Sequence, residues 1–203
     1  MYRTRTALIL AAPALALALS SCGGDQSSAP GAAAGPASPG ASGSSAAALA
    51  VGFNQQDTTF ASNMIQHHGQ AVQMADLVAS RSTDQKVIDL AAKIKAAQAP
   101  EIATMNSWLK SWGMPEVEDM SGMDMGGSMP GMMSAADLAD LAAAKGAEFD
   151  RMFLTMMVAH HEGAITMAKE QVTKGKNADA KALAGKVVAD QSAEIAQIRG
   201  MLG

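Results

Sequence analysis

Residues 157–168 read MVAHHEGAITMA, and residues 64–75 read MIQHHGQAVQMA. The two stretches lie 93 residues apart and contain all four histidines of the 203-residue chain. The same offset relates further identical residues on both sides, without a gap, from Asp57 and Asp150 to Leu109 and Leu202. Agreement at one fixed offset over this length indicates an internal duplication.

Each copy predicts a helix, a turn and a second helix. In the first copy, Asn54 with Asp57 is expected to cap a helix that ends at about residue 81. A second helix should run from residue 83 or 84 to about residue 112. Pro100 lies inside this helix and should bend it or remove one hydrogen bond.

The second copy repeats this pattern further along the chain. Ser134 with Asp137 predicts a capping box, followed by one continuous helix to about residue 173. The sequence KGKN at residues 174–177 is expected to form a turn, and a last helix should run to about residue 201. Few β-branched residues and an aromatic content of only 3% favour helices over strands.

Two helical hairpins predict an all-α fold, a ferritin-like four-helix bundle over residues 51–203. Its repeats would cover about residues 54–112 and 134–203, joined by a loop over residues 113–133. About twenty residues is long for a link between helices. At roughly 3.3 Å per residue the loop could follow a whole helix of about 42 Å. A crossover connection is therefore possible, and the topology stays open.

The first fifty residues do not resemble a folded domain. Arg3 and Arg5 precede an apolar run at residues 7–19, which predicts a secretory signal over residues 1–21 and is too short for a comfortable membrane span. The sequence LSSC at residues 19–22 resembles a bacterial lipobox and predicts a lipid on Cys22, the only cysteine. The Gly, Ala, Ser and Pro of residues 23–50 predict a flexible tether with an average reach of about 30 Å.

This organisation predicts a protein of the cell envelope, anchored by lipid on the extracytoplasmic side of a membrane. The formal net charge is −4, and the chain has no basic surface pattern that would indicate nucleic-acid binding.

The duplicated stretch places its characteristic residues on one helix face. At about 100° per residue, the residues of the first copy fall within about 120° of arc, the width of a core-facing stripe. They are Asp57, Phe60, Met64, His67, His68, Ala71, Met74 and Ala75. Met157, His160, His161, Ala164 and Met167 repeat the pattern. Imidazole nitrogen with thioether sulfur suits copper, and the thioether favours Cu(I) over hard cations.

The predicted loop is a second candidate for a soft metal. Residues 120–133 read MSGMDMGGSMPGMM, with methionines at Met120, Met123, Met125, Met129, Met132 and Met133. A loop of Gly, Ser, Pro and Asp offers these side chains no core to fill. Their close spacing lets neighbouring thioethers converge on one ion, while glycines give the backbone freedom to wrap it. The alternative is a flexible linker whose methionines are open to oxidation.

The chain resembles the family of domain of unknown function 305, which has the recurring pattern M-x-x-H-H-x-x-A-x-x-M-A. Both stretches match it, and the resemblance covers about residues 54–202. Members are similar to ferritin-like four-helix bundles, and some envelope members are described as binding copper through His and Met. The resemblance implies His67, His68, His160 and His161 with Met64, Met74, Met157 and Met167 as metal ligands. The methionine-rich loop is not part of the motif.

These observations favour metal binding over catalysis. We expect a copper-binding protein, with Cu(I) as cargo and Ag(I) as a possible surrogate. Its role would be copper buffering, copper resistance or handover of copper to a partner protein that the sequence does not identify. One alternative is a ferritin-like di-metal oxidoreductase with carboxylates from Asp57, Glu101, Asp150 and Glu194. Neither histidine pair, however, has the Glu-x-x-His spacing of such enzymes. The other alternative is an interaction module without metal, in which the histidines bond to these acids inside the core.

Overall fold

The computed structural model describes residues 52–117 and 129–203, and all of its regular elements are helices. In chain order they are α1 (Gln55–Arg81), α2 (Gln85–Ser111), α3 (Ala135–Ala143), α4 (Gly146–Lys174) and α5 (Ala178–Leu202). The predicted signal, Cys22, the tether, Met120, Met123 and Met125 lie outside the described residues. Within the described part, no helix is both long and apolar enough to cross a membrane.

The first helical hairpin forms where the sequence predicts it. Asn54 caps α1 in a capping box with Asp57, and Asp84 caps α2 through a bond from the amide of Lys86. Pro100 lies within α2, and the helix continues through it. The eight residues of the first predicted stripe are all buried. The 3.6-residue period of the apolar residues therefore located the core face of α1 correctly.

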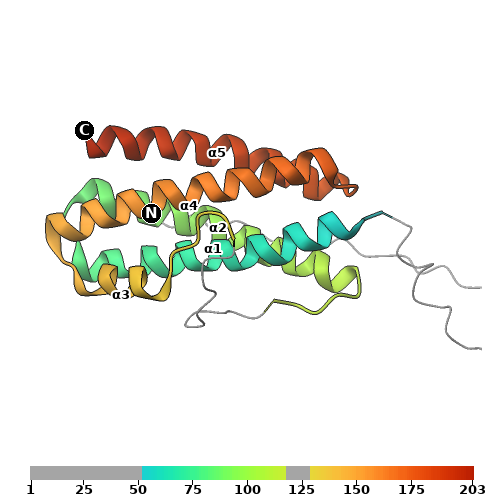
Figure 1. The fold of residues 1–203 in the computed structure, drawn as a ribbon, viewed down its shortest axis with the longest axis horizontal. Helices are drawn as coiled ribbons and strands as arrows, with labels where there is room; N and C mark the ends of the chain where they lie inside the picture. Colours follow the sequence, from blue (N-terminus) through green and yellow to red (C-terminus); the bar gives the residue numbers. More distant parts are fainter. Residues whose placement is uncertain (1–51, 118–128) are drawn as a thin grey trace, which may run out of the picture. The chain divides into compact units, whose positions relative to one another are not determined.

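The second hairpin departs from the prediction at its start. Ser134 and Asp137 do form a capping box, but the helix that they begin, α3, ends at Ala143, and α4 starts at Gly146. The predicted continuous helix over residues 134–173 is therefore wrong. Ala144 and Lys145 are extended, and Gly146 has φ of +59°, a left-handed conformation that only glycine adopts without strain. Figure 1 shows the chain reversing its direction here between α3 and α4.

The described helices pack as two hairpins, α1 with α2 and α4 with α5, that meet through α1 and α4 (Figure 1). The side chain of Asn54 donates to the carbonyl of Lys174 at 2.9 Å, so the start of α1 lies beside the end of α4 and the two helices are antiparallel. Phe53 stacks on Trp112 at 4.9 Å between ring centroids, which brings the end of α2 to the same place. The connection to α4 therefore begins and ends at opposite ends of the helices, as a crossover requires.

The core has two apolar clusters. One contains buried side chains of α1, α2, α4 and α5 with Leu141 of α3, and its largest members include Met74, Leu90, Ile94, Phe149, Phe153 and Met157. The other contains Phe60, Met64, Met105, Leu109 and Val187, with Trp108 and Met167 packed against it. Each cluster draws on both hairpins, so burial of apolar surface holds the hairpins together.

One buried carboxylate joins the two hairpins at their common end. Asp57 is fully buried, and its carboxylate accepts the side-chain amide of Gln171 at 2.6 Å. The backbone amides of Lys176 and Asn177, in the turn between α4 and α5, also donate to it at 3.1 Å. Asp150 is the equivalent residue in the other copy, and one of its oxygens is buried without a hydrogen-bond partner among the described residues. The hydrogen bonds of Asp57 to the other hairpin thus have no equivalent at Asp150 among the described residues.

We predict that Asp57→Ala lowers the free energy of unfolding by about 2–4 kcal/mol, because the donors from Gln171, Lys176 and Asn177 lose their buried acceptor. Asp150→Ala is the matched control and should cost less than about 1 kcal/mol. Urea unfolding followed by circular dichroism measures both. Equal losses in the two variants would contradict this assignment.

Candidate metal site

The four histidines form one buried layer at the middle of α1 and α4, which we call the histidine layer. His67, His68 and His161 are fully buried and His160 is 1% exposed. The rings of His67 and His160 face each other across the two helices, with 3.7 Å between their centroids. The antiparallel packing of α1 and α4 thus brings together two pairs that lie far apart in the sequence.

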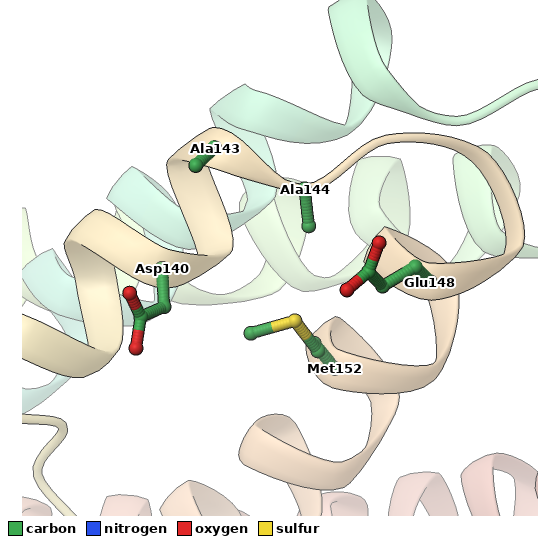
Figure 2. A pocket seen from close by; sticks show the side chains of 5 residues that line it. All are labelled: Asp140, Ala143, Ala144, Glu148 and Met152. Carbon is green, nitrogen blue, oxygen red and sulfur yellow. The ribbon is translucent and has the colours of Figure 1, made fainter.

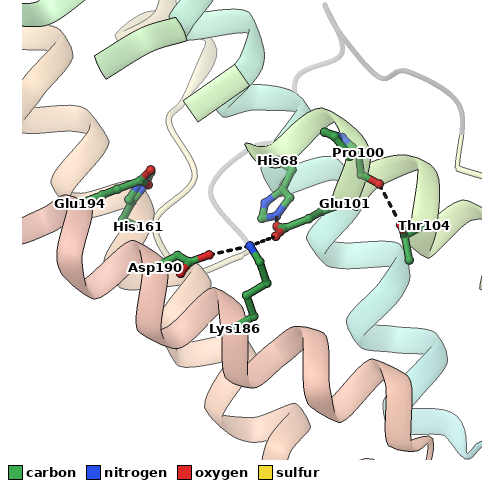
Figure 3. Close-up of polar contacts among 8 residues, drawn as sticks. All are labelled: His68, Pro100, Glu101, Thr104, His161, Lys186, Asp190 and Glu194. Atoms are coloured by element: carbon green, nitrogen blue, oxygen red, sulfur yellow. Dashed lines mark hydrogen bonds and ion pairs between the residues drawn. The ribbon is translucent and has the colours of Figure 1, made fainter. Parts of the chain in front are cut away.

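Two glutamates hold the outer histidines of this layer. His68 Nε2 lies 2.8 Å from Glu101 Oε2, and His161 Nε2 lies 2.7 Å from Glu194 Oε2. Figure 3 shows both pairs, each joining neighbouring helices of one hairpin. A carboxylate only accepts, so the Nε2–H of each imidazole is the donor. In a neutral ring, this leaves the lone pair on Nδ1 available as a metal ligand.

A backbone carbonyl orients the third histidine in the same way. His67 Nε2 donates to the carbonyl of Pro130 at 3.1 Å. The segment 129–133, the end of the predicted methionine-rich loop, is fastened there by Gln70, which accepts from the amide of Met133 at 2.8 Å and donates to its carbonyl at 2.9 Å. In its neutral form, His67 therefore also keeps its proton on Nε2 and has its lone pair on the buried Nδ1.

The close approach of this segment depends on a glycine of α4. A Cβ at Gly163 would lie 1.9 Å from the oxygen of Pro130, and Gly131 opposite has φ of +78°. No side chain fits between the two backbones, so Gly163 allows the carbonyl of Pro130 to reach His67. Apart from the presence of the two glycines, no pattern in the sequence predicts these contacts.

Five imidazole nitrogens of the layer are buried without a hydrogen-bond partner among the described residues. They are Nδ1 of His67, His68 and His161 and both nitrogens of His160. Burying an unpaired polar atom costs about 1–3 kcal/mol. Each neutral ring has one lone pair, so a cation could be bound by one nitrogen of each of the four rings. This donor set fits a metal that accepts imidazole ligands.

Burial keeps two rings of the layer uncharged. It lowers the pKa of His67 to about 3, with a further lowering from the neighbouring His68. Burial, together with the charges of His67 and His161, also lowers the pKa of His160 well below its ordinary value. Neutral rings keep the lone pairs that a metal needs.

Glu101 remains a carboxylate beside this layer. Burial opposes its ionisation, but the hydrogen bond with His68 and the contact with Lys186 outweigh burial and lower its pKa. Its ionised form can therefore accept the Nε2–H of His68 at neutral pH.

The predicted methionine ligands lie on both sides of the layer. Met64, Met74 and Met157 are fully buried, and Met167 is half-buried. Met64 and Met167 belong to one apolar cluster, while Met74 and Met157 belong to the other. The structure thus pairs the first methionine of each motif with the second methionine of the other copy.

The remaining predicted ligands are less buried or lie elsewhere. Met129, Met132 and Met133 are half-exposed at the segment that covers His67. In residues 52–117 and 129–203, no three side chains of His, Cys, Asp or Glu are arranged to hold a metal ion. A separate hollow of about 390 Å³ lies between α3 and α4, lined by Asp140, Ala143, Ala144, Glu148 and Met152 (Figure 2). The histidines do not line it.

We predict that the metal-free protein loses stability as the pH falls from 7 to 5. The unfolded His67 takes up a proton near its ordinary pKa of 6.5, whereas the folded ring stays neutral until about pH 3. The unfolded state therefore binds more protons, and this residue alone costs about 2 kcal/mol at pH 5. His160 acts in the same direction.

Urea unfolding at a series of pH values, in the presence of a chelator, measures this effect. The variant His67→Gln/His160→Gln is the control, because it lacks the two titrating rings and should show a smaller loss. A loss of the same size in both proteins would mean that other groups cause it.

Comparison with known proteins places the chain in a family. The family model DUF305, domain of unknown function, matches residues 57–202. A DUF305 protein of Streptomyces coelicolor, provisionally described as secreted, is 35% identical; the match covers 72% of this chain and 91% of that chain, with a TM-score of 0.66. A DUF305 fragment from Deinococcus radiodurans is 31% identical, with 75% and 98% covered and a TM-score of 0.68.

A third similar structure carries a metal. CopM in its Cu(II)-bound form is 32% identical to this chain, with 72% of this chain and 95% of CopM covered and a TM-score of 0.63. CopM in Cu(I)-bound, Ag-bound and apo forms is similar as well. No curated protein sequence gives a significant match. The all-helical structure, its solved relatives and a family model that covers most of the sequence agree: this chain belongs to the DUF305 family.

Proposed function

We propose that this protein binds a soft metal cation, Cu(I) with Ag(I) as its surrogate, in the histidine layer of a ferritin-like four-helix bundle. The observation that carries the proposal is the set of five buried imidazole nitrogens without hydrogen-bond partners. A layer of neutral nitrogen donors next to thioethers matches the preference of Cu(I) for soft and borderline ligands. CopM, similar over 71% of this chain, is known in Cu(I)-bound and Ag-bound forms, which supports the choice of metal.

The proposed ligands are His67, His68, His160 and His161, through the nitrogens that face the layer. Met64 with Met167 and Met74 with Met157 would supply sulfur from the two sides, since each pair shares one apolar cluster. When bound, Cu(I) would contribute only charge and affinity for soft donors. The protein's own part is to keep the rings of His67 and His160 neutral, to fix the tautomers of three rings through Glu101, Glu194 and Pro130, and to bury the layer.

Glu101 and Glu194 act as orienting groups in this proposal. Each accepts the Nε2–H of a histidine whose other nitrogen is the proposed ligand. This arrangement raises the basicity of the ligand nitrogen and holds the ring in place. The two carboxylates are occupied by these bonds, which favours a binding site over a di-metal centre with carboxylate ligands.

The methionines of the predicted loop would increase the number of metal ions that the protein binds. We propose that further soft cations are captured by Met120, Met123, Met125, Met129, Met132 and Met133. The last three belong to the segment 129–133, which bonds to His67. Capture in the loop and retention in the layer would suit buffering, resistance or handover to a partner protein.

The proposed location is the cell envelope. A signal over residues 1–21 would direct export. A lipid on Cys22 and a tether over residues 23–50 would then hold the bundle near a membrane on the extracytoplasmic side. A relative from Streptomyces that is provisionally described as secreted supports export. Proteins in this compartment meet copper and silver directly.

An interaction module without metal is the second candidate. The bonds from His68 to Glu101 and from His161 to Glu194 favour it, because they satisfy one nitrogen of each ring without a ligand. It does not account for the five nitrogens that remain unpaired. Elemental analysis of protein isolated from its own envelope separates the two functions, since a preparation without copper or silver would favour the module.

We predict that the chain without residues 1–22 competes for Cu(I) with a chromogenic chelator at micromolar concentration. Replacing Met64, Met74, Met157 and Met167 with leucine keeps volume and apolarity but removes sulfur, and should weaken binding roughly tenfold or more. Replacing all four histidines with glutamine should abolish the tightest site. Met114→Leu is the matched control, because this exposed methionine lies outside the proposed sites. No competition by the unmodified chain would exclude the proposal.

A second prediction separates the loop from the layer. Replacing the six methionines of residues 120–133 with leucine should lower the number of Ag(I) ions bound without changing the affinity of the tightest site, because the histidines remain. Native mass spectrometry counts the ions. Loss of the tightest site in this variant would instead move the primary site to the loop.

A further inference from the structure

The two histidine–glutamate pairs differ in one respect. Glu101 accepts from His68 with Oε2 and from Lys186 of α5 with Oε1, at 3.1 Å. Lys186 is in turn held by Asp190 at 2.6 Å (Figure 3). For Glu194, the contact with His161 is its only hydrogen bond or ion pair within the described part of the chain. The carboxylate of Glu101 is thus paired with an ammonium group, and the carboxylate of Glu194 is not.

The sequence explains this difference. Lys93 stands 93 residues before Lys186 and is the equivalent residue of the first copy. Residue 97, the counterpart of Asp190, is alanine, so Lys93 has no carboxylate four residues further on to hold it. Lys93 is exposed and makes no ion pair with any residue that the structure describes. The two copies therefore differ in sequence at the position whose carboxylate holds Lys186.

The contact of Lys186 with Glu101 weakens the hold of this carboxylate on His68. An ammonium group on Glu101 draws electron density from the carboxylate, which then accepts less strongly from the imidazole and leaves Nδ1 of His68 a weaker donor to a metal. Glu194 has no such contact with a cation within the described part of the chain, since the nearby Arg199 is paired with Glu162 at 2.6 Å.

Building on the proposed metal binding, we propose that the histidine layer contains two unequal half-sites. The half-site of His161 and Glu194 takes the first soft cation, and Lys186 lowers the affinity of the half-site of His68 and Glu101. Lys186 is a positioning residue, since it acts through Glu101 and does not touch the metal. The order in which the two half-sites bind cations then depends on one ion pair, between Lys186 of α5 and Glu101 of α2.

The experiment follows the imidazole nitrogens during an Ag(I) titration of the ¹⁵N-labelled chain without residues 1–22. Long-range ¹H–¹⁵N correlation spectra report each ring, and His68→Gln and His161→Gln assign the signals. In the unmodified chain the signals of His161 should shift and saturate before those of His68. The difference in apparent affinity should be roughly tenfold.

Two variants test the role of the lysine. Lys186→Met keeps the aliphatic chain and removes the charge, so the two half-sites should fill together. Lys93→Met is the matched control and should leave the order unchanged. Ala97→Asp places a carboxylate four residues after Lys93, as Asp190 is placed after Lys186. Lys93 should then pair with Glu194, and the difference in affinity between the two half-sites should become smaller.

The outcomes are distinct. Simultaneous shifts in the unmodified chain, or an unchanged order in Lys186→Met with a folded spectrum, would overturn the inference while leaving metal binding intact. If Ag(I) binds but no imidazole signal moves in any variant, the histidine layer is not the metal site, and the proposed function fails together with the inference.

Discussion

The hydrogen bond between a buried imidazole and a glutamate of the next helix is the contact on which the layer depends. It occurs twice, between residues 33 positions apart in each case. Each bond ties the two helices of one hairpin at mid-height and fixes which nitrogen carries the proton. The tilted contact between the rings of His67 and His160 then joins the two hairpins at the same height. The packing of the helices and the tautomers of the outer histidines thus depend on the same few atoms.

The duplication sets the layout, and departures from it give the two halves different properties. Asp57 clamps the turn between α4 and α5, whereas Asp150 has an unpaired buried oxygen. The segment 129–133 gives His67 a carbonyl as hydrogen-bond partner, and no carbonyl of this segment bonds to the ring of His160 within the described structure. The two halves of the histidine layer therefore differ, and the proposed ligands cannot be treated as two identical sets.

Much of the fold could be predicted because it depends on local signals. Caps at Asn54 and Ser134 and the period of the α1 stripe are properties of a few neighbouring residues, and each is confirmed. The break before Gly146 was missed because Ala144 and Lys145 carry no helix-stopping signal, and only the positive φ of the glycine reveals it. Contacts of the site such as Pro130 with His67 join residues 63 positions apart, and periodicity contains no information on them. The ligand role of the chosen residues stays a prediction.

The energetic cost of the histidine layer bears on whether its purpose is structural. A layer of leucines would fill the same space without buried polar atoms, and replacing buried polar groups with well-packed apolar ones is often neutral or stabilising. Here both nitrogens of His160 lack a well-formed hydrogen bond in the described structure, where the backbone of His67 makes only a weak contact with this ring, and three other rings have one unpaired nitrogen each. Glu101, Glu194 and the carbonyl of Pro130 take the Nε2–H of three rings, so the lone pair of each of these rings lies on a buried Nδ1. A layer without metal does not recover the cost of these unpaired atoms, whereas the proposed site recovers it on binding a cation.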